Sequence, residues 1–270
     1  MNTPLILLTN DDGIHSPGLL AAAHAVCDLG RLVIVAPQEQ QSGMGRSLPK
    51  STSGAMYTET LPIDGCPVAA YSMPGSPAQT VLYAITDLLD EPPSLVISGI
   101  NYGENLGTST TVSGTVGAAL QAGEAGIPGL AVSLETDPAA HHDPHYSATV
   151  DWTAAAYFTR LLAQKLLAEA MPGDVDTLNV NVPGHATVET PWRLTRQSRQ
   201  PYYQSLPTHR TDLSAPGQLS YKTVIDWQRL RPETDIHAFA VDHVVSVTPL
   251  SLDLTSRVGM DELKALLGSQ

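Results

Sequence analysis

The sequence predicts an α/β fold with a doubly wound, mostly parallel sheet, and two kinds of segment predict it. Short apolar runs without alternation recur up to Pro183, as expected for strands that are buried on both faces. Segments of helical periodicity lie between them, and this alternation is typical of doubly wound domains. The expected strands cover residues 5–8, 32–36, 68–72, 95–98, 129–134 and 177–182, and the expected helices cover 17–30, 77–89, 116–125 and 148–171.

The first strand ends in two adjacent acids, Asp11 and Asp12, followed by Gly13. Neighbouring side chains on a strand point to opposite faces, so both acids reach one ion only if the backbone turns, which Gly13 permits. Two close carboxylates repel each other unless they share a proton or bind a hard cation. A lone Asp-Asp pair is more often a cap followed by a solvated acid. The position between a buried strand and a well-marked helix favours the cation here.

Three helix starts carry recognisable signals. Ser16 and Ser76 stand at expected N-caps, and each is followed by a proline that suits the first helical position. Residues 113–115 (Ser-Gly-Thr) precede a helix of small residues, whose N-terminus is suited to bind an anion.

Two polar, glycine-rich loops follow strands, at residues 38–50 and 99–107. Their backbone N–H groups and hydroxyls are suited to an anion, but neither loop carries the GxxxxGK[ST] or GxGxxG pattern of nucleotide-binding proteins. An isolated SxxK match at residues 47–50 contains Pro49 and lacks its partner motifs, so it indicates nothing.

Composition limits the class of protein. Fourteen basic and 27 acidic residues among 270 give a formal charge of -13, which argues against a general nucleic-acid-binding surface. A phosphorylated substrate would need a local cation or a group of N–H donors to overcome this field. No membrane span or signal segment is evident, so we expect a cytoplasmic protein. We expect Cys27 and Cys66 to be reduced, since they have no CxxC spacing.

The pattern changes beyond Pro191. Segments at residues 192–195, 219–226 and 241–248 resemble strands joined by polar, proline-containing turns. We therefore expect a core over residues 1–190 and an extension over 191–270 that carries a β-hairpin and ends in a helix. Exposed hairpins are often covered by or exchanged with a partner chain, so we expect a homodimer or homotetramer.

Eight motifs occur in order over nearly the whole chain: TNDDG (9–13), SPG (16–18), VAP (35–37), QSG (41–43), SGINYGENLG (98–107), SGTVGAA (113–119), LNVNVP (178–183) and VSVTPLSLDLT (245–255). With this set the chain resembles the SurE family, the survival-protein nucleotidases. NDDG together with SGIN and SGTV is a specific combination, although each motif alone is weak.

The resemblance implies a Rossmann-like, three-layer αβα core with a C-terminal β-hairpin extension that exchanges between subunits. It also implies a metal-dependent phosphomonoesterase, an acid-type 5′-nucleotidase, acting on nucleoside 5′-monophosphates and in some cases 3′-monophosphates. Each subunit would hold one divalent ion, Mg²⁺ or Mn²⁺, because the implied ligands offer hard oxygen atoms. The implied metal ligands are Asp11, Asp12, Ser42 and Asn101; the implied phosphate contacts are Asn10, Gly43, Asn101, Ser113, Gly114 and Thr115.

The expected reaction is in-line attack of water on the phosphoryl group, with Asp11 or Asp12 as the catalytic proton acceptor. Backbone amides near Gly43 and Gly114 would stabilise charge on the phosphoryl oxygens. An aspartyl-phosphate route stays open, although a carboxylate that binds a metal is a poorer nucleophile.

The chain departs from the family pattern at three places. Residues 108–110 (Thr-Ser-Thr) replace an acidic pair that is usual after NLG, Val112 replaces an aromatic or polar residue, and Gln79 replaces an aspartate. These sites surround the implied metal ligands and do not include them. The departures therefore bear on substrate choice or subunit packing, and we expect catalysis to be retained.

Other residues carry weaker signals. His141, His142, Asp143 and His145 could bind a metal, but a solvated loop is the more common explanation. Tyr102 could stack on a base or simply pack, and the same holds for Tyr202 and Tyr203. Arg46 and Lys50 either offset the acidic field near the phosphate or are exposed cations.

Two functions compete with the nucleotidase. One is a catalytically weak relative that binds metal and nucleotide without turnover, for which the altered segment 108–112 is the reason. The other is a transferase with a nucleotide-linked donor, against which the missing dinucleotide motif counts.

Overall fold

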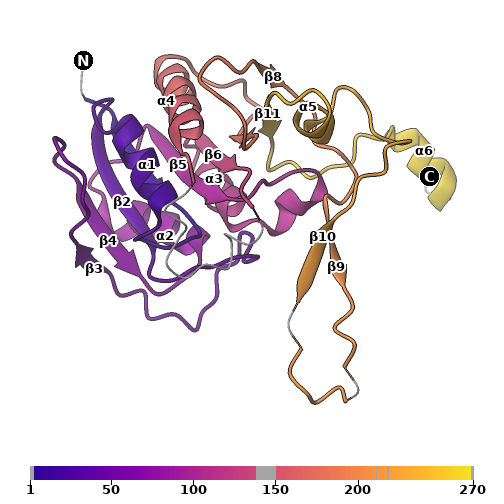
Figure 1. Ribbon diagram of the computed structural model, residues 1–270, viewed down its shortest axis with the longest axis horizontal. Helices are drawn as coiled ribbons and strands as arrows, with labels where there is room; N and C mark the ends of the chain where they lie inside the picture. The colour runs from indigo at the N-terminus through magenta and orange to yellow at the C-terminus, as the bar shows by residue number, and fades with distance from the viewer. Residues whose placement is uncertain (1–2, 138–149, 211, 218, 269–270) are drawn as a thin grey trace.

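The computed structural model describes residues 3–137, 150–210, 212–217 and 219–268 (Figure 1). Strands β1 to β7 cover Leu5–Thr9, Arg31–Pro37, Tyr57–Glu59, Ala69–Met73, Leu95–Tyr102, Gly129–Leu134 and Thr177–Val182. Strands β8 to β11 cover Trp192–Leu194, Tyr203–Leu206, Ser220–Thr223 and Val245–Leu250. Helices α1 to α6 cover Pro17–Val26, Pro77–Tyr83, Gly114–Glu124, Thr153–Ala168, Asp235–Ala240 and Met260–Leu267.

Within the described ranges, one nine-stranded sheet has the order β3-β4-β2-β1-β5-β6-β7-β11-β8. The strands from β4 to β7 are parallel, whereas β3 and β11 run antiparallel to their neighbours β4 and β7. The chain runs outward from β1 to β2 and β4 on one side, and from β5 to β7 on the other. The pair β1 and β5 is therefore the topological switch point, beside which ligands bind in such sheets.

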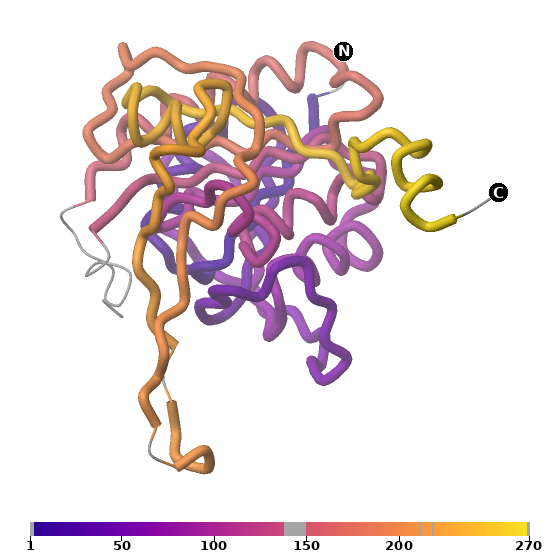
Figure 2. Tube along the Cα trace, turned by 90° about the vertical axis from the view of Figure 1, so that its right-hand side faces the viewer, coloured from indigo at the N-terminus to yellow at the C-terminus, as the bar shows by residue number. Residues whose placement is uncertain are grey.

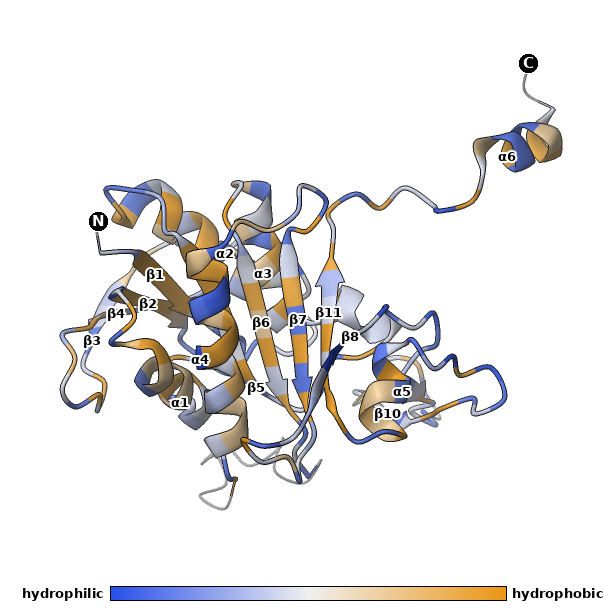
Figure 3. Ribbon diagram, turned by 90° about the horizontal axis from the view of Figure 1, so that it is seen from above, coloured by the Kyte–Doolittle hydropathy of each residue, from blue (hydrophilic) through white to orange (hydrophobic). Residues whose placement is uncertain are grey.

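Helices cover both faces of the sheet (Figure 3), which confirms the predicted α/β fold. Strand β1 shows why, since its alternate residues enter different cores. Ile6 and Leu8 pack with α1 and α4, while Leu5 and Leu7 pack with α2 and α3. All four are buried, so a continuous apolar run forms this strand.

Helix starts follow the sequence signals with one exception. Ser76 forms a complete capping box with Gln79, and Ser113 accepts a hydrogen bond from Val116 N. Ser16 stands at the N-cap of α1, but its hydroxyl makes no capping hydrogen bond, so the expected cap is wrong in that respect. Pro17 alone marks this start.

Part of the expected extension belongs to the main sheet. Strand β11 continues the sheet beyond β7, and β8 pairs with β11. Strands β9 and β10 form a separate hairpin that projects from the body of the protein (Figures 1 and 2). Helix α6 lies beyond an extended segment, away from the sheet (Figure 3). The division at residue 190 stays a prediction.

The prediction that both cysteines are reduced is wrong. Cys27 and Cys66 form a disulfide across a sequence separation of 39 residues. Cys27 follows the last residue of α1, and Cys66 lies in the loop before β4. Sequence spacing does not indicate this pair, because it depends on a tertiary contact between the end of α1 and the loop before β4.

No helix among the described residues combines the length and apolar character that crossing a membrane requires.

Candidate active site

The polar sequence after β1 turns sharply at the switch point of the sheet. Gly13 has φ of +98°, which confirms the turn expected at this glycine. The Asn10 side chain is fully buried and donates to Gly13 O over 2.9 Å, so it closes the turn from inside. The turn thereby holds Asp11 and Asp12, which lie between Asn10 and Gly13, at the carboxyl end of β1 beside β5.

Asp11 and Asp12 are both buried, with exposed fractions of 5% and 1%. Asp11 Oδ1 accepts a hydrogen bond from Thr115 Oγ1 at 2.6 Å. Asp12 accepts from Tyr102 N at 3.1 Å and from Gln40 Nε2 at 3.2 Å. Burial raises the pKa of both carboxyls, and the charge of Asp11 raises the pKa of Asp12 further. The fold thus keeps two acids together at a cost that a bound cation would remove.

Asn101 reaches the same site from β5. Its amide nitrogen donates to Tyr102 O at 2.9 Å and to Gly103 O at 2.7 Å. The register between β5 and β6 shifts between Ser98 and Asn101, so the end of β5 is irregular where this side chain leaves it. With the nitrogen engaged, the amide oxygen is the atom left to contact a ligand.

The loop after β2 is tied to the aspartates through the backbone. Gln41 N donates to Asp11 O over 2.7 Å. Ser42 and Gly43 follow directly and are exposed, and Gly43 has φ of +75°. In the described part of the chain, the Ser42 hydroxyl makes no hydrogen bond to either aspartate. The role of Ser42 as a metal ligand stays a prediction.

The N-terminus of α3 packs against Asp11. A Cβ added at Gly114 would lie 2.8 Å from both Cβ and Oδ2 of Asp11, so only glycine fits. The first N–H groups of a helix have no partner within it, and here they start beside a carboxylate. Ser113 caps the helix, and the Thr115 hydroxyl holds Asp11. The start of α3, a candidate anion site, therefore adjoins the candidate metal site.

The donor set fits a hard divalent cation. Asp11 forms no ion pair within the described residues, and Asn10 Oδ1 is a buried acceptor without a hydrogen-bond partner there. The described ranges contain no group of three or more His, Cys, Asp or Glu residues arranged for a metal. Any ion here would therefore rely on two carboxylates together with neutral oxygen atoms, a set that suits Mg²⁺ or Mn²⁺ better than Zn²⁺.

Several weaker candidates lie elsewhere. Tyr102 is buried edge-on against Trp152, with ring centroids 4.9 Å apart, so it packs in the interior. Tyr203 donates to Glu104 at 2.7 Å, and Arg46 pairs with Glu124 at 2.7 Å. The cluster His141, His142, Asp143 and His145 lies outside the described residues.

Sequence reasoning missed a buried polar network that holds the loop after β5. Asn179 and Asn181 of β7 donate to Asn105 O at 2.8 and 3.1 Å, and Asn181 Oδ1 accepts from Asn105 N at 2.6 Å. Ser133 Oγ accepts from Asn105 Nδ2 at 2.9 Å. The signal was present, because two asparagines spaced by two residues in an apolar strand share one face.

Comparisons with known proteins agree with this geometry. The pattern of the family described as survival protein SurE matches residues 6–204. A 5′-nucleotidase SurE of Methanosarcina acetivorans is 38% identical over 274 residues, with 98% of each chain covered. One of Methanocella arvoryzae is 41% identical over 256 residues, with 93% of each chain covered. The crystal structure of the SurE protein from Aquifex aeolicus has a TM-score of 0.75 and 32% identity, covering 98% of this chain and 100% of that one.

Proposed function

The chain belongs to the survival protein SurE family, and from that premise we propose that it is a divalent-metal-dependent nucleotidase. It hydrolyses nucleoside 5′-monophosphates, and 3′-monophosphates as a second class, to nucleoside and phosphate. The observation that carries this proposal is the buried pair Asp11 and Asp12 with the start of α3 packed against Asp11. The carboxylates that would bind a cation and the helix N-terminus that would bind phosphate are thereby adjacent, as a metal phosphatase requires.

Asp11, Asp12, Ser42 and Asn101 would hold the ion, which when bound supplies polarisation of the phosphate and activation of a water. The chain's own groups do the rest. The N–H groups at Gly43 and at the start of α3 bind phosphoryl oxygens and stabilise their growing charge. A carboxylate oxygen of Asp11 or Asp12 accepts the proton of the attacking water. Thr115, Tyr102 and Gln40 fix these carboxylates in place.

The test is phosphate release from a panel of nucleoside monophosphates with Mn²⁺, Mg²⁺ or chelator. We expect metal-dependent turnover that Asp11→Asn abolishes. Asp64→Asn is the matched control, because Asp64 is an exposed acid in the loop before β4, at the amino end of the parallel strands and so away from the candidate site. Equal activity of Asp11→Asn and wild type, or full activity in chelator, would overturn the proposal.

The segment Thr108–Val112 favours a second candidate, a relative that binds metal and nucleotide with little turnover. This segment holds the loop after β2 through a hydrogen bond from Gly45 N to Val112 O at 2.9 Å. It also meets the extension, where Gln197 donates to Thr110 Oγ1 at 2.6 Å. Metal-dependent binding without phosphate release would establish this alternative.

We also propose that the protein is a homo-oligomer assembled through its C-terminal extension. A two-stranded hairpin is only marginally stable alone, and all four side chains of β10 are exposed. Leu213, Leu266 and Leu267 have exposed fractions of 89%, 78% and 74%, although they are large and apolar. Light scattering of the full chain tests this, with a deletion of residues 207–219 as the comparison; a monomeric full chain would contradict it.

A further inference from the structure

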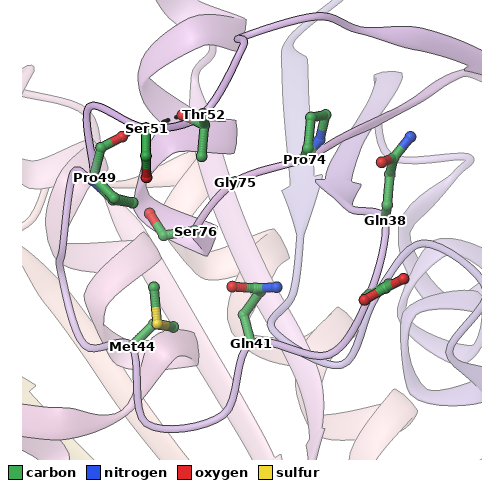
Figure 4. A pocket seen from close by; sticks show the side chains of 10 residues that line it. Gln38, Gln41, Met44, Pro49, Ser51, Thr52, Pro74, Gly75 and Ser76 are labelled. Carbon is green, nitrogen blue, oxygen red and sulfur yellow. Dashed lines mark hydrogen bonds between the residues drawn. The ribbon is translucent and has the colours of Figure 1, made fainter.

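A pocket of about 410 Å³ lies between the loop after β2 and the turn into α2 (Figure 4). This volume falls within the range of about 300–1,000 Å³ that is usual for small-molecule sites. Its lining comes from the loop after β2, the segment that follows it, and the turn into α2: Gln38, Glu39, Gln41, Met44, Pro49, Ser51, Thr52, Pro74, Gly75 and Ser76.

The pocket opens next to the candidate phosphate position. Its lining residue Gln41 donates to Asp11 O through its backbone, and a Cβ added at Gly13 would lie 3.4 Å from the carbonyl carbon of the lining residue Glu39. On the opposite side, Pro77 follows the lining residue Ser76, and its Cγ lies 3.1 Å from where a Cβ of Gly114 would be. One molecule can therefore reach from the start of α3 into the pocket.

The side chains that line the pocket favour the uncharged part of a phosphorylated ligand over its phosphate group. None of the ten lining residues is basic, and Glu39 is acidic, so a phosphate group would be repelled. Two glutamine amides and the Glu39 carboxylate suit a ligand with both donors and acceptors. Met44, Pro49 and Pro74 offer apolar surface for a flat ring.

We propose that this pocket binds the nucleoside part of the substrate, and that Gln79 positions its outer wall. This inference rests on the proposed function, since it places the substrate's phosphate at Asp11. Gln79 does not line the pocket. Its Nε2 donates to Pro49 O at 2.7 Å and to Thr52 Oγ1 at 3.0 Å, and its Oε1 accepts from Ser76 N at 3.0 Å. It thereby joins two sides of the pocket.

The first test narrows the pocket. Ser51→Trp introduces a large side chain at an exposed lining residue, and Ser53→Trp is the matched control two residues along, outside the lining. Activity is measured on adenosine 5′-monophosphate and on p-nitrophenyl phosphate, which has no nucleoside. We expect Ser51→Trp to lower kcat/KM for adenosine 5′-monophosphate about tenfold or more relative to kcat/KM for p-nitrophenyl phosphate. Ser53→Trp leaves this ratio unchanged.

The second test separates positioning from helix capping. Gln79→Glu keeps an acceptor for Ser76 N but cannot donate to Pro49 or Thr52. We expect KM for the nucleotide to rise roughly fivefold to tenfold, as for the loss of one or two hydrogen bonds, with kcat little changed. Thr52→Val removes the bond from Gln79 Nε2 and also the bond from Thr52 Oγ1 to Pro49 O, and it leaves the bond from Gln79 to Pro49 O in place, so KM should shift in the same direction. Calorimetric binding of adenosine to each variant gives a readout that is independent of turnover.

The outcomes distinguish this inference from the proposed function. Equal losses on both substrates, or wild-type adenosine binding by both Ser51→Trp and Gln79→Glu, would overturn the pocket assignment while leaving the phosphatase intact. Absence of phosphate release from either substrate by the wild-type protein would overturn the proposed function instead. A fall in kcat at unchanged KM in Gln79→Glu would also contradict the positioning role.

Discussion

Thr115 donates its hydroxyl hydrogen to Oδ1 of Asp11 over 2.6 Å, although 104 residues separate the two in the chain. The bond joins the first turn of α3 to the end of β1, and thus the anion-binding element to the acid pair. It also lowers the pKa of Asp11, against the larger effect of burial. A residue that the resemblance assigns to phosphate binding therefore has its side chain committed to a carboxylate, and its backbone N–H also interacts with Asp11 and lowers the pKa of that carboxyl.

Thr115→Val should weaken metal binding about 10-fold to 100-fold, because groups that orient metal ligands typically have effects of this size. The valine fills the same volume and lacks only the hydroxyl. Half-saturating Mn²⁺ concentration and kcat are the measurements. Thr115→Ser keeps the hydroxyl and should stay close to wild type; if the serine and valine variants behave alike, the hydrogen bond has no functional role.

Gly114→Ala should reduce kcat/KM by more than about tenfold, since the added Cβ would approach Asp11 within 2.8 Å and force the acid or α3 to move. Gly173→Ala is the control, because a Cβ there meets nothing within 4 Å. Steady-state kinetics with circular dichroism separates a local effect from unfolding. Wild-type kinetics of Gly114→Ala would show that the close contact is not needed.

The sequence predicts the sheet well, and it also predicts that polar residues after β1 and β5 meet at one sheet edge, because both depend on local patterns. Apolar runs such as residues 5–8 are long enough to identify buried strands, and polar residues after two of them place the site at one sheet edge. Helix ends are less well predicted: α2 ends at Tyr83 and a π-helical segment, Ala84–Leu88, follows, where one helix to residue 89 was expected. The apolar residues over 77–89 do not mark the point at which the helix changes from α to π.

Contacts between distant segments could not be predicted from local patterns. The pairing of Gln79 with Pro49 and Thr52 depends on how a long loop returns to α2. Strand β9 was missed because its four residues include only two that are large and apolar. Strand β11 was expected, but its place in the main sheet follows from pairing with β7 rather than from its own sequence.

The disulfide between Cys27 and Cys66 should contribute about 2–4 kcal/mol to the free energy of unfolding, mainly by restricting the unfolded chain. Urea unfolding with and without dithiothreitol measures this contribution. The double variant Cys27→Ser, Cys66→Ser should match the reduced wild type and show no response to the reductant. If the oxidised wild type and this variant unfold at the same urea concentration, the disulfide does not stabilise the protein.

Glu104 should make the protein less stable as pH rises. It is buried beside the base of the hairpin, where Tyr203 donates to it, and burial raises its pKa. The folded protein then keeps this proton to a higher pH than the unfolded chain does, so folding stability falls as pH rises through the range between the two pKa values.

Glu104→Gln removes the charge and retains an acceptor for Tyr203, so it should raise Tm by a few °C at pH 8, and the gain should shrink by pH 5. Thermal unfolding of both proteins at several pH values measures the effect. Glu169→Gln, at an exposed residue after α4, controls for the change in net charge. A gain that is equal at both pH values, or that grows as pH falls, would show that the glutamine acts through packing and that Glu104 does not titrate as its burial implies.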